Sequence, residues 1–224
     1  MHQPKSKKIL LYLFFFLFIG TLNNKNFNNL QLPKIKSISV SGLNEKDNYE
    51  LMNNLNYLKI ENLFFLNAEK MSEIFNSNNL IDKYSVFKKY PSEINVKIDK
   101  TSFLAQIKKG NENFLLGSNG KLIKTKFLKS DIPIIFGNFD NKNFFDLKRA
   151  LKESNFFYKE IKNLYFFPSG RWDIETHNGI LIKLPKSDIK KSLDLLIIFL
   201  NTNTKNEITQ IDLRQANKII TNGK

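Results

Sequence analysis

The chain has 224 residues, a formal net charge of +14 and no cysteine. The lack of cysteine excludes disulfides, thiol catalysis and cysteine metal sites. An aromatic content of 13% argues against a disordered chain. The charge invites a nucleic-acid interpretation, but Arg149, Arg171 and Arg214 are the only arginines and the lysines are dispersed. Attraction to anionic lipid headgroups is the favoured consequence of the charge.

The first predicted element is an apolar segment, Ile9–Leu22, which follows Lys5, Lys7 and Lys8. As a helix it would span about 21 Å, short of the ~30 Å hydrocarbon core, and this length favours a signal peptide. No small-x-small cleavage pattern follows Leu22, however. We therefore predict an uncleaved transmembrane signal anchor over residues 9–24, with a cytoplasmic basic tail at 1–8 and the remainder exported. A cleaved signal peptide is the alternative.

Residues 34–101, after an asparagine-rich linker at 25–33, predict a small α+β domain. A strand at 35–42 precedes a helix at 44–58, and Asn67 is placed to cap a second helix. Two alternating runs, 83–89 and 93–100, flank a Tyr-Pro-Ser turn and predict a hairpin. The expected order is strand, helix, helix, strand, strand.

Residues 102–224 predict a second domain, mainly antiparallel β-sheet with flanking helices. The turn Gly117–Gly120 lacks either glycine-rich phosphate-loop pattern and is interpreted as a hairpin. A short strand at 131–137 and a helix at 140–154 follow. His177-Asn178-Gly179 predicts the turn of a second hairpin. A helix at 187–200, with Ser187 as its cap, and segments 208–213 and 218–221 complete the chain.

Recognisable catalytic chemistry is missing. His2 and His177 are the only histidines, and no metalloprotease, calcium-loop or nucleophile-elbow pattern accompanies them. Asp173 and Glu175 are neighbours on one strand face, where paired carboxylates would suit glycoside chemistry. We interpret them instead as the solvated face of a hairpin. We predict no catalytic, cofactor-binding or metal site, and no enzyme.

Several motifs, in order along the chain, resemble the FtsQ/DivIB family of bacterial cell-division proteins. Ile35–Gly42 reads I-x-x-I-x-V-x-G, similar to the opening of the family's POTRA domain, and the hairpin at Phe87–Ile98 is similar to the end of that domain. Ile132–Gly137 and Ile211–Arg214, with its Asp-Leu-Arg signature, resemble elements of the family's β-domain. Gln215 departs from members that carry an aromatic residue there.

The resemblance implies a non-catalytic scaffold without cofactors. It implies a single-pass type II protein of the bacterial inner membrane, mostly periplasmic and enriched at the division septum. The family's POTRA domain is recruited by upstream division proteins such as FtsK, and its β-domain binds FtsB and FtsL. The alternative is another membrane-anchored POTRA protein that serves secretion or outer-membrane assembly.

The last strand, Lys218–Thr221, is predicted to offer a free edge to an extended partner segment. The resemblance assigns FtsB binding to Arg214, although a buried pair with Asp212 is the alternative. Arg171 is a weaker candidate, and Trp172 is predicted to lie in the core. The predicted partner-binding residues are Arg171, Arg214, Gln215, Lys218, Ile219, Ile220 and Thr221, and the predicted anchor runs from Ile9 to Leu22.

Overall fold

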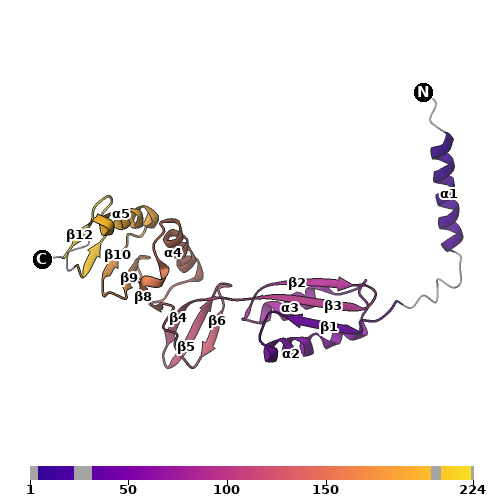
Figure 1. Cartoon of the computed structure of the whole chain (residues 1–224), viewed down its shortest axis with the longest axis horizontal. Helices are drawn as coiled ribbons and strands as arrows, with labels where there is room; N and C mark the ends of the chain where they lie inside the picture. The colour runs from indigo at the N-terminus through magenta and orange to yellow at the C-terminus, as the bar shows by residue number, and fades with distance from the viewer. Residues whose placement is uncertain (1–4, 23–31, 203–207, 223–224) are drawn as a thin grey trace.

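The computed structural model describes residues 5–22, 32–202 and 208–222. Residues 1–4 of the predicted tail and most of the predicted linker lie outside the described residues. The described chain contains a helix, α1 (Lys5–Leu22), a first unit with a three-stranded sheet, and a second unit with a nine-stranded sheet. Figure 1 shows the two units one after the other, with α1 set apart beyond the first and the C-terminus at the far end of the second.

Helix α1 contains the apolar segment predicted from the sequence. Its side chains from Ile9 to Ile19 are all exposed, and their exposed fractions range from 52% to 78% where an apolar side chain is large. This helix therefore lacks the buried face of a core helix. None of the helices among the described residues reaches the length and hydrophobicity needed to cross a bilayer.

The first unit has the predicted strand-helix-helix-strand-strand order. Its strands are β1 (Ser37–Ser41), β2 (Ile81–Lys89) and β3 (Glu93–Lys100), and β3 lies between a parallel β1 and an antiparallel β2. Its helices are α2 (Glu45–Asn54) and α3 (Ala68–Ser77). The predicted helix 44–58 ends early, because the chain tightens after α2 into the 3₁₀ helix η2 (Asn56–Ile60).

Local sequence sets the helix starts of this unit. The Asn44 and Asn67 side chains accept hydrogen bonds from the backbone N–H groups of Asp47 and Lys70, so the predicted Asn67 cap is confirmed. Met71 and Phe75 of α3 are buried in one apolar cluster with Ile94, Val96 and Ile98 of β3. The four-residue spacing of Met71 and Phe75 places both on one face of the helix, and the two-residue spacing of the β3 residues places them on one face of the strand. One core therefore forms between the two layers.

The second unit is built on a sheet of strand order β12-β11-β10-β9-β8-β7-β4-β5-β6. Its strands are β4 (Phe103–Lys109), β5 (Glu112–Gly117), β6 (Leu122–Thr125), β7 (Ile134–Phe136), β8 (Ile161–Phe166), β9 (Trp172–Thr176), β10 (Leu181–Lys183), β11 (Gln210–Asp212) and β12 (Ile220–Thr221). The β5–β6 and β9–β10 hairpins form where the sequence predicts them.

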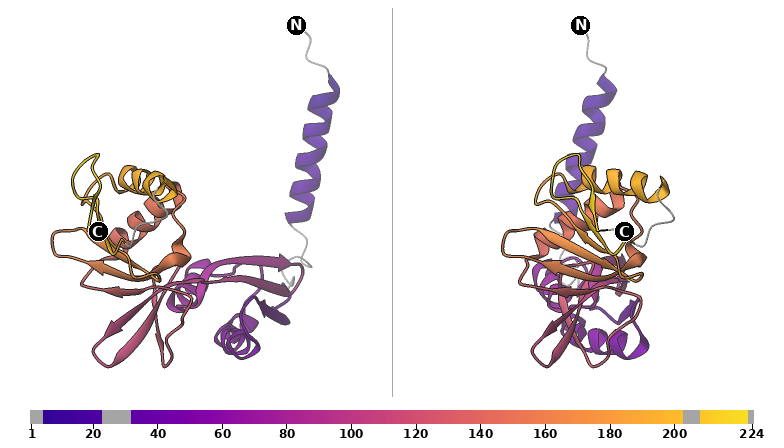
Figure 2. Two further views of the ribbon diagram at one scale, coloured as in Figure 1. Left: turned by 60° about the vertical axis from the view of Figure 1, so that its left-hand side comes forward. Right: turned by 90° about the vertical axis from the view of Figure 1, so that its left-hand side faces the viewer.

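Two helices of this unit connect parallel strands. Helix α4 (Asn141–Glu153) and the short 3₁₀ helix η3 (Tyr158–Glu160) lie between β7 and β8, and α5 (Ile189–Thr202) lies between β10 and β11. A helical crossover lets consecutive strands run parallel. The two helices pack together on one face of the sheet (Figure 2). The fold is therefore mixed α+β, as predicted, with parallel pairs inserted among the antiparallel ones.

The core of the second unit lies between this sheet and the two helices. Phe144, Leu147 and Leu151 of α4 and Leu193 and Leu196 of α5 are buried against the sheet. Trp172 is 2% exposed, and its ring lies 4.7 Å from the ring of Phe166 and 5.7 Å from that of Phe139. The prediction that Trp172 belongs to the core is confirmed.

The interpretation of Asp173 and Glu175 as a solvated hairpin face was wrong. Asp173 is only 3% exposed, and Glu175 is partly buried. Strand β9 is an interior strand, and long side chains of its neighbours fold over its second face. The Arg171 Nε donates to Asp173 at 3.3 Å, while Tyr165 Oη and Asn163 Nδ2 donate to Glu175 Oε2 at 2.6 and 2.9 Å.

Side chains of the β5–β6 turn tie the second unit to the first. Asn119 Nδ2 donates to the carbonyl oxygens of Asn79 at 2.9 Å and Ile81 at 2.8 Å. Lys121 Nζ donates to the Asn76 carbonyl at 2.5 Å. Only Thr101 and Ser102 separate β3 from β4. The units are thus joined by a short connection and a few polar contacts.

Candidate functional site

The C-terminal strand forms one edge of the nine-stranded sheet. Strand β12 pairs antiparallel with β11, with Ile211 opposite Thr221 and Asp212 opposite Ile220. Ile220 is 47% exposed, whereas Ile219 packs against the core. The outer side of β12 has no neighbouring strand in the described sheet, so its backbone groups can pair with an added strand.

Asn222 holds this edge strand in place. Its Oδ1 accepts a hydrogen bond from the Gln210 backbone N–H at 2.7 Å, and its side chain contacts Thr209 Oγ1 at 2.9 Å. A two-residue strand makes few ladder bonds of its own, so this side-chain clamp supplies the missing restraint. Sequence reasoning missed Asn222, which gives no signal beyond being an asparagine at the end of a strand.

Arg214 is both paired and available. Its Nε lies 2.9 Å from each carboxylate oxygen of Asp212, its Nη2 also contacts Asp212, and its side chain remains 44% exposed. The hydrogen bonds from Arg214 lower the pKa of Asp212 below its ordinary value, despite the opposing effect of burial. The alternative weighed from the sequence, a pair with Asp212, is therefore present, but the guanidinium is half-exposed.

Arg171 repeats this arrangement at the start of β9, which β10 separates from β11. Its Nε donates to Asp173, and its guanidinium carbon lies 4.3 Å from the centre of the Phe167 ring. Burial raises the pKa of Asp173, and the hydrogen bond from Arg171 opposes that rise. Lys183 of β10 lies in register between Asp173 and Asp212. Each arginine is thus held by an acid two residues away in the sequence.

On the sheet face away from the helices, next to the β12 edge, basic side chains therefore lie over buried carboxylates. Arg171, Lys183 and Arg214 come from three successive segments of the sheet, and the carboxylates of Asp173 and Asp212 lie beneath them. Sequence reasoning named Asp212 as an alternative partner of Arg214, but it missed Lys183 and the pairing of Asp173 with Arg171. The signal was present in the paired spacings Arg-x-Asp and Asp-x-Arg. Such a surface can accept carboxylates from an extended segment paired with β12.

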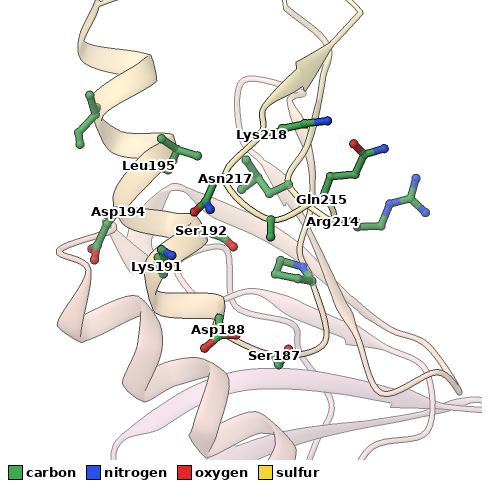
Figure 3. A pocket seen from close by; sticks show the side chains of 14 residues that line it. Ser187, Asp188, Lys191, Ser192, Asp194, Leu195, Arg214, Gln215, Asn217 and Lys218 are labelled. Carbon is green, nitrogen blue, oxygen red and sulfur yellow. The ribbon is translucent and has the colours of Figure 1, made fainter.

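A cavity of about 490 Å³ lies on the opposite side of the same edge, between α5 and the loop from Leu213 to Lys218. Figure 3 shows Asn217 across from Ser192 and Leu195 of α5, while Arg214, Gln215 and Lys218 extend away from the helix. Leu195, Ile198 and Leu213 give it an apolar lining. The cavity has room for an apolar side chain of a segment that extends past β12.

The predicted partner-binding residues fall into two groups. Arg214, Gln215, Lys218, Ile219, Ile220 and Thr221 form one continuous loop and edge strand, and Arg171 lies two strands further into the sheet. Among the described residues, no group of three His, Cys, Asp or Glu side chains is arranged to hold a metal ion. The arrangement favours binding of a polypeptide.

Both units match known protein families. Residues 34–100 match the family "POTRA domain, FtsQ-type", and residues 105–214 match "Cell division protein FtsQ/DivIB, C-terminal". The second match ends at Arg214, so β12 lies beyond it. A match to a β-domain of this kind after the POTRA unit favours the cell-division interpretation over the other anchored POTRA proteins.

Individual proteins agree with these matches. The chain is 23% identical to "Cell division protein FtsQ" of Rhizobium meliloti (strain 1021), over 80% of this chain and 60% of that protein. It is also 23% identical to "Cell division protein FtsQ" of Rickettsia bellii (strain RML369-C), over 83% of this chain and 70% of that protein.

A solved structure, the major extracytoplasmic domain of the cell-division protein DivIB from Geobacillus stearothermophilus, aligns with 47% of this chain and 95% of its own, at 16% identity and a TM-score of 0.34. The family matches, which together take in both units of the described fold, give the assignment. The chain belongs to the FtsQ/DivIB family of bacterial cell-division proteins.

Proposed function

We propose that the protein is a membrane-anchored, non-catalytic scaffold of the bacterial division machinery, and that it binds partner proteins through the β12 edge. The observation that carries this proposal is a free edge strand beside the half-exposed Arg214, at the end of a unit of the FtsQ/DivIB family. The proposed partners at this edge are the periplasmic segments of FtsB and FtsL. Upstream division proteins such as FtsK are the proposed partners of the first unit.

The proposed anchor is α1. Its 18 residues would extend about 27 Å as a helix, somewhat short of the ~30 Å hydrocarbon core, in line with the finding that its length and hydrophobicity fall below those of a usual span. Lys7 and Lys8 stand at its start and no charged residue follows within the helix. Lysines at a helix end can extend to the lipid interface and make up a small deficit in length. The exposed apolar side chains of α1 need cover, and a bilayer supplies it. In this topology both units lie on the periplasmic side of the inner membrane.

The mode of binding we propose is strand addition. An extended segment would pair with β12 by main-chain hydrogen bonds, with one side chain entering the cavity beside α5. Carboxylates of the segment would contact Arg214 and then Arg171. Because both arginines are already oriented by buried acids, little side-chain entropy is lost when they bind.

The test is a binding titration of the full chain, in detergent, against purified FtsB–FtsL periplasmic segments of the same cell. We expect Ile220→Lys and Arg214→Glu each to weaken binding by about tenfold or more, as interface hot spots do. Truncation after Gln215 should abolish it. The matched controls are Phe157→Lys, an exposed apolar residue away from the edge, and Lys124→Glu on the opposite edge strand β6.

Three outcomes are informative. Weakened binding by the edge variants alone supports both the partner and the edge. Unchanged affinity in the edge variants would support FtsB and FtsL as partners but contradict β12 as the binding site. No binding by the folded wild-type chain would contradict FtsB and FtsL as the partners.

A further inference from the structure

The end of the first unit where the chain enters from α1 carries exposed aromatic side chains. Phe64, Phe65 and Tyr90 are 56%, 75% and 59% exposed, and the rings of Phe64 and Tyr90 lie 5.2 Å apart. Large apolar side chains that gather on a surface mark contact sites. We name Phe64, Phe65 and Tyr90, with the neighbouring Ile60, which is 74% exposed, the aromatic tip.

Local structure holds this tip outward. Asn62 Oδ1 accepts hydrogen bonds from the backbone N–H groups of Phe64 and Phe65 at 3.0 and 3.1 Å, a turn that presents both rings. Leu63, between Asn62 and Phe64, is fully buried and anchors the loop in the core. Lys88 Nζ donates to the Leu63 carbonyl at 2.7 Å. The two phenylalanines are therefore exposed by an ordered turn.

The tip lies where the chain arrives from α1. Lys34 bridges to Asn62, the Ile35 N–H donates to the Glu61 carbonyl at 3.0 Å, and the Lys36 N–H donates to the Ser92 carbonyl at 2.8 Å. The arrowhead of β2, which ends at Lys89 just before Tyr90, points to this end of the unit (Figure 1). Nine residues separate Leu22 from Leu32, a chain length that reaches at most about 36 Å. The tip is thus tethered within reach of the end of α1.

The charge around the tip is positive. Lysines surround it at positions 34, 36, 59, 88 and 89, all exposed, and the acids of the same region are Glu61 and Glu93. Aromatic rings surrounded by lysines match the chemistry of a lipid headgroup interface, where rings enter the boundary layer and ammonium groups meet phosphates.

We propose that the aromatic tip docks the first unit onto the surface of an anionic bilayer, the one that holds α1. This inference rests on the proposed membrane attachment of α1. Docking would fix the height and tilt of the first unit above the membrane, and through the polar contacts of Asn119 and Lys121 it would orient the second unit and its β12 edge. The occupant is therefore lipid, and the consequence is a defined presentation of the partner-binding edge.

The test uses the full chain in lipid nanodiscs, and the absence of cysteine makes any introduced cysteine a unique labelling site. A polarity-sensitive fluorophore is attached at Phe65→Cys, at Asp82→Cys on the far end of the same unit, or at Leu11→Cys in α1. Doxyl lipids then quench from within the bilayer. We expect about twofold or stronger quenching at position 65 in phosphatidylglycerol-containing discs, and no change at position 82, because an interfacial contact inserts only about 5–10 Å.

Further variants separate the contributions to docking. In the Phe65→Cys background, Phe64→Ser with Tyr90→Ser should reduce lipid quenching to the level of position 82. Phe127→Ser, at an aromatic of the second unit that is 80% exposed, should leave it unchanged. Lys34→Glu with Lys59→Glu, high salt, or discs of phosphatidylcholine alone should each reduce quenching partially. Circular dichroism of each variant confirms that the unit is folded.

The label in α1 tells failure of the tip from failure of the anchor. Quenching at position 11 without quenching at position 65 overturns the tip proposal and leaves the anchor. A label at position 65 that is shielded from aqueous iodide but not quenched by doxyl lipids identifies a protein contact, such as a second copy of the chain, and also overturns it. No quenching at position 11 overturns the membrane attachment, and with it the basis of the tip proposal.

Discussion

The two units cover their sheets in different ways. In the first unit, β3 alternates strictly, with Ile94, Val96 and Ile98 buried and the residues between them exposed or partly exposed. In the second unit, β9 is buried on both faces, and Asp173 lies on the face away from the helices. A sheet with one solvated face requires only that apolar residues occupy the other face. A sheet buried on both faces must also provide hydrogen-bond partners for its buried polar groups.

Buried polar side chains follow the same division. Among the described residues, Ser92 is the only one of the first unit, whereas the second unit and its entry have Thr101, Gln106, Ser154, Asp173, Thr176 and Asp212. Gln106 illustrates the role of such groups, because its side chain bonds the backbone at both Lys129 and Ile132 and fixes the loop before β7. The proposed binding edge therefore lies in the unit whose polar interior restricts side-chain orientation.

The largest expected effect tests whether the two units unfold separately. Trp172→Ala should destabilise the second unit by about 3–5 kcal/mol, because it leaves a cavity between Phe139 and Phe166. Phe75→Ala, at an equally buried ring of the first unit, is the matched variant. Hydrogen exchange read by mass spectrometry should show faster exchange in residues 103–221 for the first variant and in 37–100 for the second. Faster exchange in both units from either variant would show that they unfold together.

A close backbone approach recurs in both units and gives the next effect. Gly42 and Gly137 have φ values of +112° and +100°, and a Cβ there would lie 1.9 Å from the Ile98 carbonyl oxygen and 2.1 Å from that of Phe166. Alanine at either should cost about 2–3 kcal/mol through strain and the clash with a rigid strand. Gly110→Ala, with positive φ but open space, should cost about 1 kcal/mol. Urea denaturation measures the free energy of unfolding of all three variants. Equal losses at the three positions would show that the clash with the strand contributes nothing.

The first unit follows its sequence closely because local patterns set its helix starts and the buried faces of its strands. Asn44 and Asn67 start its helices, and the alternation of residues 93–100 selects the buried face, so the strand-helix-helix-strand-strand order was predictable. In the second unit the hairpin at Asn178-Gly179 and helix α4 were predictable for the same reason.

What the sequence left open depends on contacts between distant segments. Strand β4 was not predicted, and its parallel pairing with β7 brings together Gln106 and Ile134. Hydrophobic period reports which face of a strand is buried but not which strand lies beside it. The burial of Asp173 depends in the same way on neighbouring strands. The free edge of β12 was anticipated, since a last strand often ends a sheet, but its clamp by Asn222 was not.

The acids of the second unit give a smaller, pH-dependent effect. The lowered pKa of Asp212 means that its stabilisation is present above its unfolded pKa and is lost as the pH falls through its folded pKa. Arg214→Gln should therefore lower the free energy of unfolding slightly at neutral pH, since the pair is partly exposed, and by less at an acid pH below the folded pKa of Asp212. Urea titrations at both pH values measure this. An equal cost at both would assign the effect of Arg214 to packing.

Asp173 should show the opposite sign. Because the folded pKa of Asp173 is raised, its ionisation opposes folding, and the protein loses stability as the pH rises through that pKa. Asp173→Asn should therefore lessen the loss of stability above that pKa. The free energy of unfolding from acid to neutral pH, compared with the parent chain, measures the difference. An unchanged pH profile would contradict the dominant effect of burial on the pKa of this carboxyl.

The smallest effect is expected at the opposite edge of the sheet, where Lys124 of β6 pairs with Glu112 of β5. This contact is close, yet the side chains are 65% and 51% exposed, so water already solvates both charges and ordering two long side chains offsets the attraction. Lys124→Ala should therefore change the free energy of unfolding by less than about 0.5 kcal/mol. A larger loss of unfolding free energy in urea denaturation would show that the ion pairs at the two edges of the sheet contribute alike. A negligible one supports the view that burial of Asp212, and not proximity alone, gives the Arg214 pair its energetic weight.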